Sequence, residues 1–380
     1  MLTGPALSRF RRKLLAWFAE FQRDLPWRRT KNPYRIWLSE IMLQQTRVAA
    51  VIPYYQRFLQ HFPDVKVLAK APEQEVLRLW AGLGYYSRAR NLQKAAQQIV
   101  AEHDSRFPDT AATALQLSGI GAYTAAAILS IAYAKRLAVL DGNVARVIAR
   151  LGAIRGDLRS GSRWQQLQKK ADELLAPNAP GDWNQAMMEL GATLCTPRSP
   201  RCLLCPLAEF CEARKLGLVE LIPEKRTKRA NVQITLAALV LVDPEGRTLL
   251  LAPHRGEKPH TEPDVAALLS RMWHFPTIQV RRDAAEELRA LAGTFDPSGQ
   301  RLRFKIRALP QARHTVTYRQ ITVLPFRMEV RKLPRIVHAT MLSLDDLSSV
   351  PISNLTRKVA CAARIPQEVA DKKTRSPRAL

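Results

Sequence analysis

The sequence contains no hydrophobic run long enough to cross a membrane. Its longest apolar stretch without a charged residue, 122–134, is shorter than the about 20 residues that a membrane helix requires. Near the N-terminus, four basic residues precede only a brief apolar piece, 14–19, so we expect no secretory signal. No internal repeat is found. These absences predict a cytoplasmic protein that does not associate with membranes.

Acidic residues are scarce in this chain of 380 residues. It has 33 Asp and Glu residues and 59 Lys and Arg residues, which gives a net charge of +26. Such an excess favours a polyanionic partner, because neutralising phosphates releases counterions. Charge alone does not choose between DNA, RNA and an anionic membrane. The hydrophobic share of 47% is typical of a globular protein, and the length allows two or three domains.

Cysteines are also few, and four of the five lie close together. Cys195, Cys202, Cys205 and Cys211 form a C-x6-C-x2-C-x5-C loop, whereas Cys361 is read as an ordinary thiol. In a reducing compartment such cysteines are better read as metal ligands than as disulfides. A single C-x2-C pair within uneven spacings favours a 4Fe-4S cluster, and structural zinc is the alternative.

The periodicity of apolar residues divides the chain in two. Residues 1–222 read as almost entirely helical, 223–231 as a basic linker, 232–365 as a domain of mixed α and β type, and 366–380 as a disordered tail. The helices expected first are 8–21, 35–50, 53–61, 71–81, 88–102 and 111–116. The second domain is expected to hold strands at 234–242, 248–251 and 321–330, alternation at Leu302, Phe304 and Ile306, and a helix at 284–291.

A two-glycine turn precedes the uncharged stretch. Gly119 and Gly121 predict a hairpin that leads into a buried helix, which ends near Lys135-Arg136. Glycine lets the backbone approach a ligand, and the free N–H groups of a helix start can hold a phosphate. Asp141 comes before the next helix, which begins near Val144, so we expect it to cap that helix and to be ionised. Taken alone, the glycines are also explained by an ordinary turn between two helices, and Asp141 by an ordinary helix cap.

Glu40 lies in the second predicted helix with apolar neighbours. Gln44 and Arg47 follow it at helical spacing along the same face, while Trp37 and Leu43 flank it on either side. Apolar surroundings raise the pKa of a carboxyl group. We therefore expect an acid that keeps its proton near neutral pH.

Together, the hairpin with Asp141, the helix with Glu40 and the cysteine loop resemble the helix-hairpin-helix DNA glycosylases that carry an iron–sulfur cluster. Within that family the chain resembles the adenine DNA glycosylases of the MutY kind. The matching segments are Leu25–Arg28, Trp37–Val48, Gly82–Leu92, Leu140–Val147 and Trp183–Gly191. The resemblance implies a mainly α glycosylase fold, with the helix-hairpin-helix at about 115–145 and the cluster loop at 195–211, followed by an α+β Nudix-like domain.

The resemblance implies base excision repair: hydrolysis of the N-glycosidic bond of adenine mispaired with 8-oxoguanine or guanine in duplex DNA. Protonated Glu40 would donate to adenine N7 and later activate water, and Asp141 would steady the cationic sugar. Tyr123 and Asn143 would support this chemistry. The related endonuclease III group has a lysine at the position of Tyr123 that forms a Schiff base, so we expect little strand cleavage here.

The same resemblance assigns further contacts. The expected base-pocket residues are Arg23, Trp27, Arg28 and Gln185, each of which could equally be packing or surface. The residues expected at the duplex are Gln45, Thr46, Leu83 and Tyr85, with Gly119 and Gly121 gripping the backbone. We expect a monomer, associated with the nucleoid if bacterial.

The second domain resembles the Nudix-like module that examines the base opposite adenine. Met272–Pro276 fits the family's Trp-x-Phe-Pro pattern, and no Nudix catalytic box is evident, so we assign no nucleotide hydrolysis. The family's Phe-Ser-His is replaced by Val316, Thr317 and Tyr318. Thr317 keeps a hydroxyl for a base edge, but the changes beside it put 8-oxoguanine discrimination in doubt.

Two other functions remain open on the sequence. One is a glycosylase of the same fold for another mismatched base such as thymine. The other is a non-catalytic DNA-binding protein that keeps the cluster as a scaffold.

Overall fold

The computed structural model describes most of the chain. The described residues are 3–224, 230–253, 269, 272–295 and 306–364. They form two compact units, a helical unit (1–71 and 87–228) and a mixed unit (72–86 and 229–380). Most of the predicted linker and all of the predicted tail lie outside the described residues. Within the part that is described, we find no helix with the length and apolar character to span a membrane.

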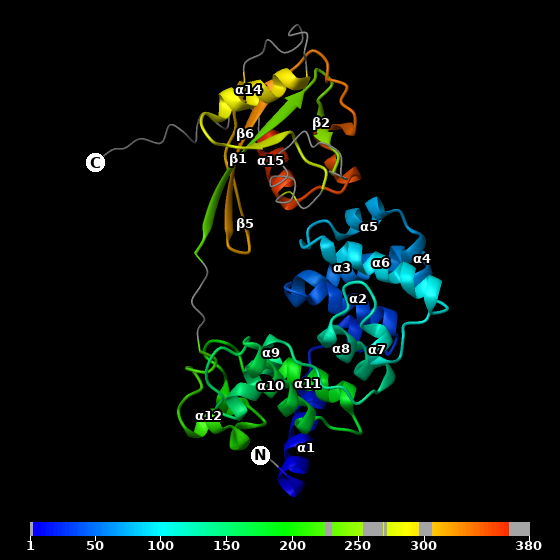
Figure 1. Cartoon of the computed structure of the whole chain (residues 1–380), viewed down its shortest axis with the longest axis vertical. Coiled ribbons are helices and arrows are strands. Elements are labelled where there is room, and N and C mark those ends of the chain that lie inside the picture. The colour runs from blue at the N-terminus through cyan, green and yellow to red at the C-terminus, as the bar shows by residue number, and fades with distance from the viewer. Residues whose placement is uncertain (1–2, 225–229, 254–268, 270–271, 296–305, 365–380) are drawn as a thin grey trace, which may run out of the picture. The chain divides into compact units, whose positions relative to one another are not determined.

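The first unit is helical throughout, as the sequence predicts (Figure 1). Its helices are α1 (Gly4–Phe21), α2 (Pro33–Leu43), α3 (Val48–His61), α4 (Val65–Lys70), α6 (Ser87–Glu102), α7 (Ala111–Ala114), α8 (Ala122–Tyr133), α9 (Gly142–Leu151), α10 (Gly161–Leu174), α11 (Pro180–Thr193) and α12 (Glu212–Lys215), with 3-10 turns η1 (Pro26–Arg28), η2 (Cys202–Leu204) and η3 (Ala208–Phe210).

The start and the end of α2 have local causes. Asn32 caps the helix by accepting hydrogen bonds from the N–H groups of Tyr34 and Arg35, and Pro33 suits the first turn. Beyond Leu43 the chain leaves the helical conformation, with Gln45 at a left-handed φ of 57°. The predicted helix 35–50 is therefore wrong between residues 44 and 47.

This break overturns one expectation about the polar face. Glu40, Gln44 and Arg47 do not share a helical face, because the last two follow the end of α2. The predicted helix 71–81 is confirmed with shifted ends, because the structure has a helix at Glu73–Trp80. The predicted helix 111–116 is shorter and consists of the single turn α7.

The hairpin before α8 requires glycine at one position. Gly119 has a φ of +78°, and a Cβ there would lie 2.8 Å from the Cβ of Asn91. The turn leads into α8, which the sequence predicts. That helix ends at Tyr133, slightly before the predicted position, because Ala134 takes the left-handed conformation and closes it.

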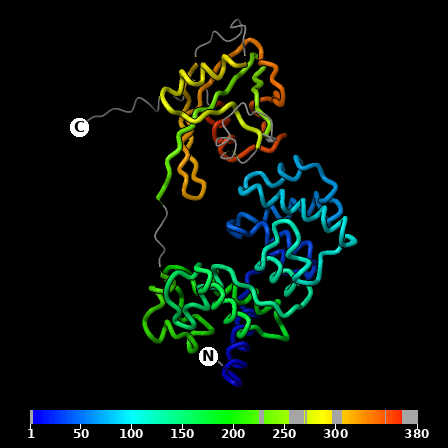
Figure 2. The backbone as a smooth tube through the Cα atoms, viewed as in Figure 1, coloured from blue at the N-terminus to red at the C-terminus, as the bar shows by residue number. Residues whose placement is uncertain are grey.

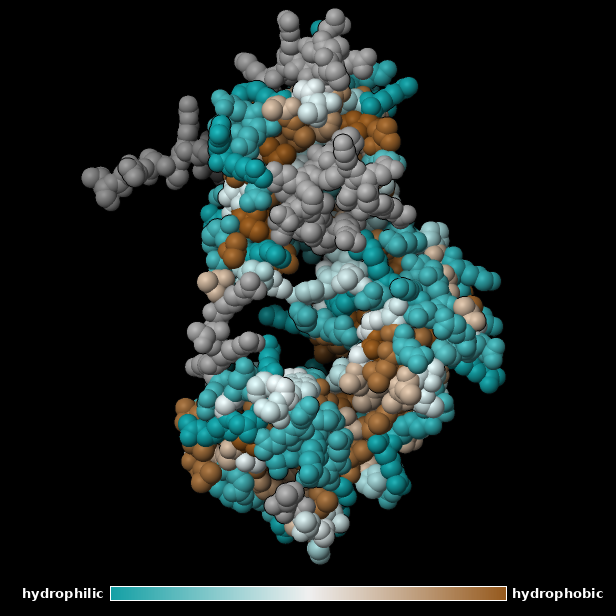
Figure 3. All heavy atoms as spheres, viewed as in Figure 1, coloured by the Kyte–Doolittle hydropathy of each residue, from teal (hydrophilic) through white to brown (hydrophobic). Residues whose placement is uncertain are grey.

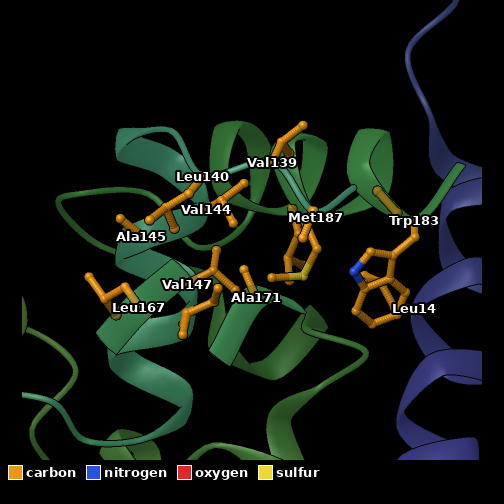
Figure 4. Close-up of a cluster of buried hydrophobic side chains, with 14 of the residues drawn as sticks. Leu14, Val139, Leu140, Val144, Ala145, Val147, Leu167, Ala171, Trp183 and Met187 are labelled. Carbon is orange, nitrogen blue, oxygen red and sulfur yellow. The ribbon is translucent and has the colours of Figure 1, made fainter. Parts of the chain in front are cut away.

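Part of the core of the helical unit is drawn in Figure 4. Val144 and Val147 of α9 pack in the same cluster as Trp183 and Met187 of α11. Burying an apolar side chain of this size stabilises the fold by about 1.5–3 kcal/mol. The first turn of α9, which Asp141 caps, is thus fixed by the core.

The mixed unit is built on a sheet that has seven strands among the residues that the structure describes. Figure 1 draws strands of this sheet as arrows, and Figure 2 follows the same backbone as a tube. Its strands are β1 (Val232–Val242), β2 (Arg247–Leu251), β3 (Thr277–Gln279), β4 (Ile306–Ala308), β5 (Ala312–Val316), β6 (Arg319–Glu329) and β7 (Ala339–Ser343), and its helices are α5 (Glu73–Trp80), α14 (Ala284–Phe295) and α15 (Asn354–Arg364), with the turn η4 (Leu347–Ser349). The main path is β4-β6-β1-β2-β7, while β3 pairs with β1 and β5 with β6. Strands β1 and β6 are parallel, and the other pairs are antiparallel.

Residues of β1 alternate between the two faces of this sheet. Val240 belongs to the apolar cluster that includes Val359 of α15, and Leu239 to the cluster that includes Leu288 of α14. One helix therefore covers each face, as Figure 1 shows. The α+β class is confirmed, and its layers agree with the Nudix-like domain that the resemblance implies.

The predicted strands 234–242, 248–251 and 321–330 and the predicted helix 284–291 are confirmed with shifted ends. Of the alternating residues 302, 304 and 306, only Ile306 lies in the described part, where it begins β4. The sequence did not predict β3, β5, β7 or α15. Hydrophilic side chains cover much of the visible face of each unit (Figure 3).

Replacing Gly119 by alanine tests the hairpin. We expect Gly119→Ala to lower the free energy of unfolding by at least about 1–2 kcal/mol, the cost of a left-handed conformation for a residue with a Cβ. Gly161→Ala is the matched control, because a Cβ there meets no atom within 4 Å. Urea denaturation measures both variants, and equal stabilities would contradict the assigned strain.

Candidate active site

A cleft of about 530 Å³ opens in the helical unit. It is lined by residues of α2, α8 and α11, by the cap of α9 and by the segments that flank α2. The predicted residues that line it are Arg23, Trp27, Arg28, Glu40, Gln45, Thr46, Tyr123, Asp141, Asn143 and Gln185. The structure therefore brings Glu40 and Asp141 into one cavity, although about 100 residues of sequence separate them.

Glu40 is buried at the wall of this cleft. Its side chain comes from α2, and its Oε2 accepts a hydrogen bond of 2.8 Å from the hydroxyl of Tyr123. Burial raises the pKa of Glu40 to about 7; the bond from Tyr123 opposes this shift, and the charge of Asp141 adds to it. The group can therefore carry a proton near neutral pH.

Tyr123 lies in the first turn of α8, directly after the hairpin. Its hydroxyl also lies 3.2 Å from the sulfur of Met188. Burial, and then the charge of Glu40, raises the pKa of this phenol well above its ordinary value. Tyr123 is therefore a neutral donor that orients the carboxyl group.

Asp141 caps α9, as the sequence predicts. Its Oδ1 accepts a bond of 2.7 Å from the N–H of Val144, and its Oδ2 accepts one of 3.1 Å from the amide of Asn143. Burial raises the pKa of Asp141, and the two hydrogen bonds act in the opposite direction. The cap fixes the position of this carboxyl group, while its ionisation is set by a balance between burial and hydrogen bonding.

A chain of hydrogen bonds joins Asp141 to the cysteine loop. Arg146 donates bonds of 2.9 Å to Asn143 Oδ1 and to the carbonyl of Cys195. Arg150 donates to the sulfur of Cys195 at 3.3 Å. The cap of α9 and the first predicted cluster ligand are thus held by two neighbouring guanidinium groups of one helix.

Glu189 is a site residue that sequence reasoning missed. It is buried on α11 and accepts hydrogen bonds of 2.6 and 2.7 Å from Arg23 and one of 2.8 Å from Arg28. Burial would raise the pKa of Glu189, but the bonds from the two arginines outweigh it and lower that pKa to about 2. A signal was available in the sequence: Arg23 and Arg28 were both expected in the pocket, and two neighbouring positive charges there require an acidic partner.

The other predicted pocket residues differ in exposure. Trp27 is buried in η1 and makes an edge contact with Tyr55, with ring centroids 5.4 Å apart. Gln185 is half-buried on α11, at the lining of the cleft.

Three predicted DNA-contact residues lie in the mixed unit rather than in this cleft. Leu83 is buried, whereas Tyr85 is 42% exposed with a φ of 50°. Thr317 is exposed at the turn between β5 and β6, and its hydroxyl donates to the carbonyl of Val316 at 2.7 Å. In the helical unit, Gly119 and Gly121 form the hairpin.

The four loop cysteines have the surroundings that a cluster requires. Each is half-buried. Backbone hydrogen bonds from Leu207 and from Arg214 reach the sulfurs of Cys205 and Cys211. Burial, together with the charges of the neighbouring cysteines, raises the pKa of Cys205 to about 12, so a positively charged centre is needed to hold Cys205 as a thiolate. Among the described side chains, no three His, Cys, Asp or Glu converge on a point that a single metal ion could occupy.

Two family models match the chain. Residues 38–177 match the HhH-GPD superfamily base excision DNA repair proteins. Residues 195–211 match the iron-sulfur binding domain of endonuclease III, which begins and ends at the outer cysteines. The predicted 4Fe-4S cofactor is confirmed in place of the zinc alternative.

Curated relatives agree with the resemblance to the MutY kind. An adenine DNA glycosylase of Homo sapiens is 49% identical over 218 residues, which are 55% of this chain and 40% of the relative. One of Buchnera aphidicola subsp. Acyrthosiphon pisum is 40% identical over 225 residues, which are 59% of this chain and 64% of the relative. The match thus spans less than two thirds of the length of either relative.

A solved structure shows the same fold. A thermostable thymine-DNA glycosylase aligns with 55% of this chain and 97% of its own, at 28% identity and a TM-score of 0.51.

Because the pKa of Glu40 is raised, replacing its carboxyl group should change the stability of the protein in a way that depends on pH. A carboxyl group whose pKa rises on folding stabilises the folded protein fully when the pH is below the pKa of that group in the unfolded chain. This contribution is lost as the pH rises through the folded-state pKa of about 7. The unfolding free energy of Glu40→Gln relative to wild type should therefore increase by about 3 kcal/mol between pH 4 and pH 8. Urea titrations measure this difference.

The exposed Glu20 of α1 provides the control. A change of the same size in Glu20→Gln would mean that the effect is not specific to Glu40. A Glu40→Gln difference that stays constant with pH would mean that the carboxyl group ionises as an ordinary surface glutamate does.

Proposed function

We propose that this protein is a DNA glycosylase of base excision repair that hydrolyses the N-glycosidic bond of adenine mispaired with 8-oxoguanine or guanine. The observation that carries the proposal is the pair of carboxyl groups in one cleft, Glu40 with a pKa of about 7 and Asp141 fixed by a helix cap. Separated acid and anion roles are the logic of glycoside hydrolysis.

Glu40 would act first as a general acid. Adenine is a poor leaving group as an anion, so protonation at N7 is needed as the bond to the sugar breaks. The hydroxyl of Tyr123 donates to Oε2 of Glu40, which leaves Oε1 to carry the proton toward the base. After the base departs, the same carboxylate would accept a proton from the attacking water.

Asp141 would stabilise the positive charge that develops on the sugar. Its two oxygens are oriented by Val144 and Asn143, so it needs no rearrangement during the reaction. A cationic sugar beside it favours the ionised carboxylate and opposes the effect of burial.

Glu189 and its two arginines give the cleft a polar group that suits an adenine. The carboxylate of Glu189 is kept ionised by Arg23 and Arg28, and it can accept a hydrogen bond from the exocyclic amine of adenine. Trp27 and Gln185 would complete the pocket. A thymine presents a carbonyl oxygen where adenine has its amine, and that oxygen would face the same carboxylate unfavourably.

The remaining predicted contacts are proposed as the hold on duplex DNA. Backbone N–H groups at the start of α8, after Gly119 and Gly121, would bind a phosphate. Gln45 and Thr46, and in the mixed unit Leu83 and Tyr85, would contact the duplex near the opposing base. Thr317 would offer its hydroxyl to that base. The net charge of +26 supports a polyanionic partner.

Strand cleavage is not expected to accompany base release. A lyase requires an amine that attacks the sugar, and Tyr123 provides a phenol whose pKa burial raises further. The enzyme would therefore be monofunctional or a weak lyase.

We assign Cys195, Cys202, Cys205 and Cys211 as the ligands of the cluster. When bound, the cluster cross-links a loop that is otherwise held by short turns. Arg146 and Arg150 connect that loop to the cap of α9, so the loop would support the position of Asp141.

A base-release assay on duplexes with each opposing base tests the proposal. We expect free adenine from duplexes that pair it with 8-oxoguanine or guanine, with little strand cleavage until alkali is added. Glu40→Gln should slow release by at least about a hundredfold, because a general acid contributes roughly 10²–10⁴ in rate. Duplex binding in a gel-shift assay should persist.

Glu20→Gln is the matched control and should release adenine as wild type does. Release of thymine instead of adenine would favour the alternative of a glycosylase for mismatched thymine. The similarity of the fold to a solved thymine-DNA glycosylase is the observation in favour of that alternative. An Asp141→Asn variant with every activity unchanged would favour the non-catalytic alternative, and unaltered excision by Glu40→Gln would refute the assigned acid.

A further inference from the structure

The hydroxyl of Tyr123 lies within hydrogen-bond distance of two acceptors. One is Oε2 of Glu40, at 2.8 Å, and the other is the sulfur of Met188, at 3.2 Å. A phenol has a single proton to donate, so the two acceptors compete for it. The outcome of this competition depends on the charge of Glu40.

An ionised Glu40 provides the stronger acceptor. A hydrogen bond to a charged group is about twice as strong as one between neutral groups, whereas a thioether sulfur accepts only weakly. The hydroxyl of Tyr123 then donates to Oε2. When Oε1 carries the proton, Oε2 is a neutral carbonyl oxygen, and the sulfur of Met188 receives a larger share of the hydroxyl hydrogen.

Met188 differs from its neighbour on α11 in where it lies. Met187 is buried in the apolar core beside Trp183 (Figure 4). Met188 is half-buried and lines the cleft together with Tyr123. Packing at this position requires an apolar side chain of suitable volume but no sulfur. The contact between that sulfur and a hydroxyl is therefore a feature that packing does not explain.

We propose that Met188 is a positioning residue, whose sulfur accepts the hydrogen bond of Tyr123 while Glu40 is protonated and loses it to Oε2 when Glu40 is ionised. As Oε1 gives its proton to the departing base, the hydroxyl hydrogen turns from the sulfur toward Oε2. It stays bonded to the oxygen of Tyr123 throughout. The step at the base rests on the proposed function, whereas the two contacts of the hydroxyl do not.

The charged groups around this trio have partners of their own. Arg23 and Arg28 donate to Glu189 of α11. Asp141 is bound in the cap of α9, and Arg88 of α6 donates to carbonyls of α2. The start of α3 contributes an apolar side chain to the cleft. These groups are held in place, so the turning hydroxyl is the local response to the proton of the acid.

A ¹³C NMR titration of the Glu40 carboxyl in the holoprotein tests this role, because the sulfur favours the protonated form. Met188→Leu conserves the volume and removes the acceptor. The midpoint of the titration should fall by about 0.5 pH unit, the effect of one weak hydrogen bond. Met187→Leu is the matched control and should leave the midpoint in place. Met188→Ile, which also lacks an acceptor, serves if Met188→Leu does not fold.

The Tyr123→Phe background separates the hydrogen bond from packing. Without the hydroxyl, the sulfur of Met188 has no bond to accept, so adding Met188→Leu should leave the midpoint of Glu40 unchanged. An equal fall with and without the hydroxyl, an equal fall in Met187→Leu, or no fall in Met188→Leu would overturn the proposal and show that Met188 only packs.

The titration is carried out without DNA, so its result is independent of the proposed function. Adenine release under single-turnover conditions adds a second readout. The alkaline limb of its pH profile should move to lower pH by the same amount in Met188→Leu, because the acid loses its proton earlier. A lowered midpoint without adenine release from any duplex would support the role of Met188 and count against the proposed function.

Discussion

The burial of one carboxyl group, that of Glu40, is the constraint on which this site depends. The proposed protonation of a departing base near neutral pH is most efficient when the pKa of the acid lies near that pH, and burial raises the pKa of Glu40 to about 7. The hydroxyl of Tyr123 limits the shift and fixes the orientation of the group. The hairpin is thereby linked to the chemistry, because Tyr123 directly follows Gly121 and Ala122.

Asp141 is positioned by a helix cap. Its place comes from the cap of α9. That helix packs in the apolar core, and its residues Arg146 and Arg150 donate hydrogen bonds to the cysteine loop. In the proposed assignment, a cluster bound by Cys195 would support the cap through Arg146 and Asn143.

Local features were predictable and distant pairings were not. The apolar neighbours of Glu40 indicated its raised pKa, and the position of Asp141 before a periodic segment indicated a cap. The end of α2 was not predicted, because the segment 44–47 contains neither glycine nor proline and Gln45 nevertheless has a φ of 57°. Glu189 was missed because its partners Arg23 and Arg28 are 166 and 161 residues away. The short strands of the mixed unit likewise depend on pairings that no local pattern encodes.

The most direct measurement of the central claim is a ¹³C NMR titration of the side-chain carboxyl of Glu40 in the holoprotein, with the signal assigned by its loss in Glu40→Gln. The account predicts a midpoint near pH 7. A midpoint near pH 4.5, the ordinary value for a glutamate, would contradict it.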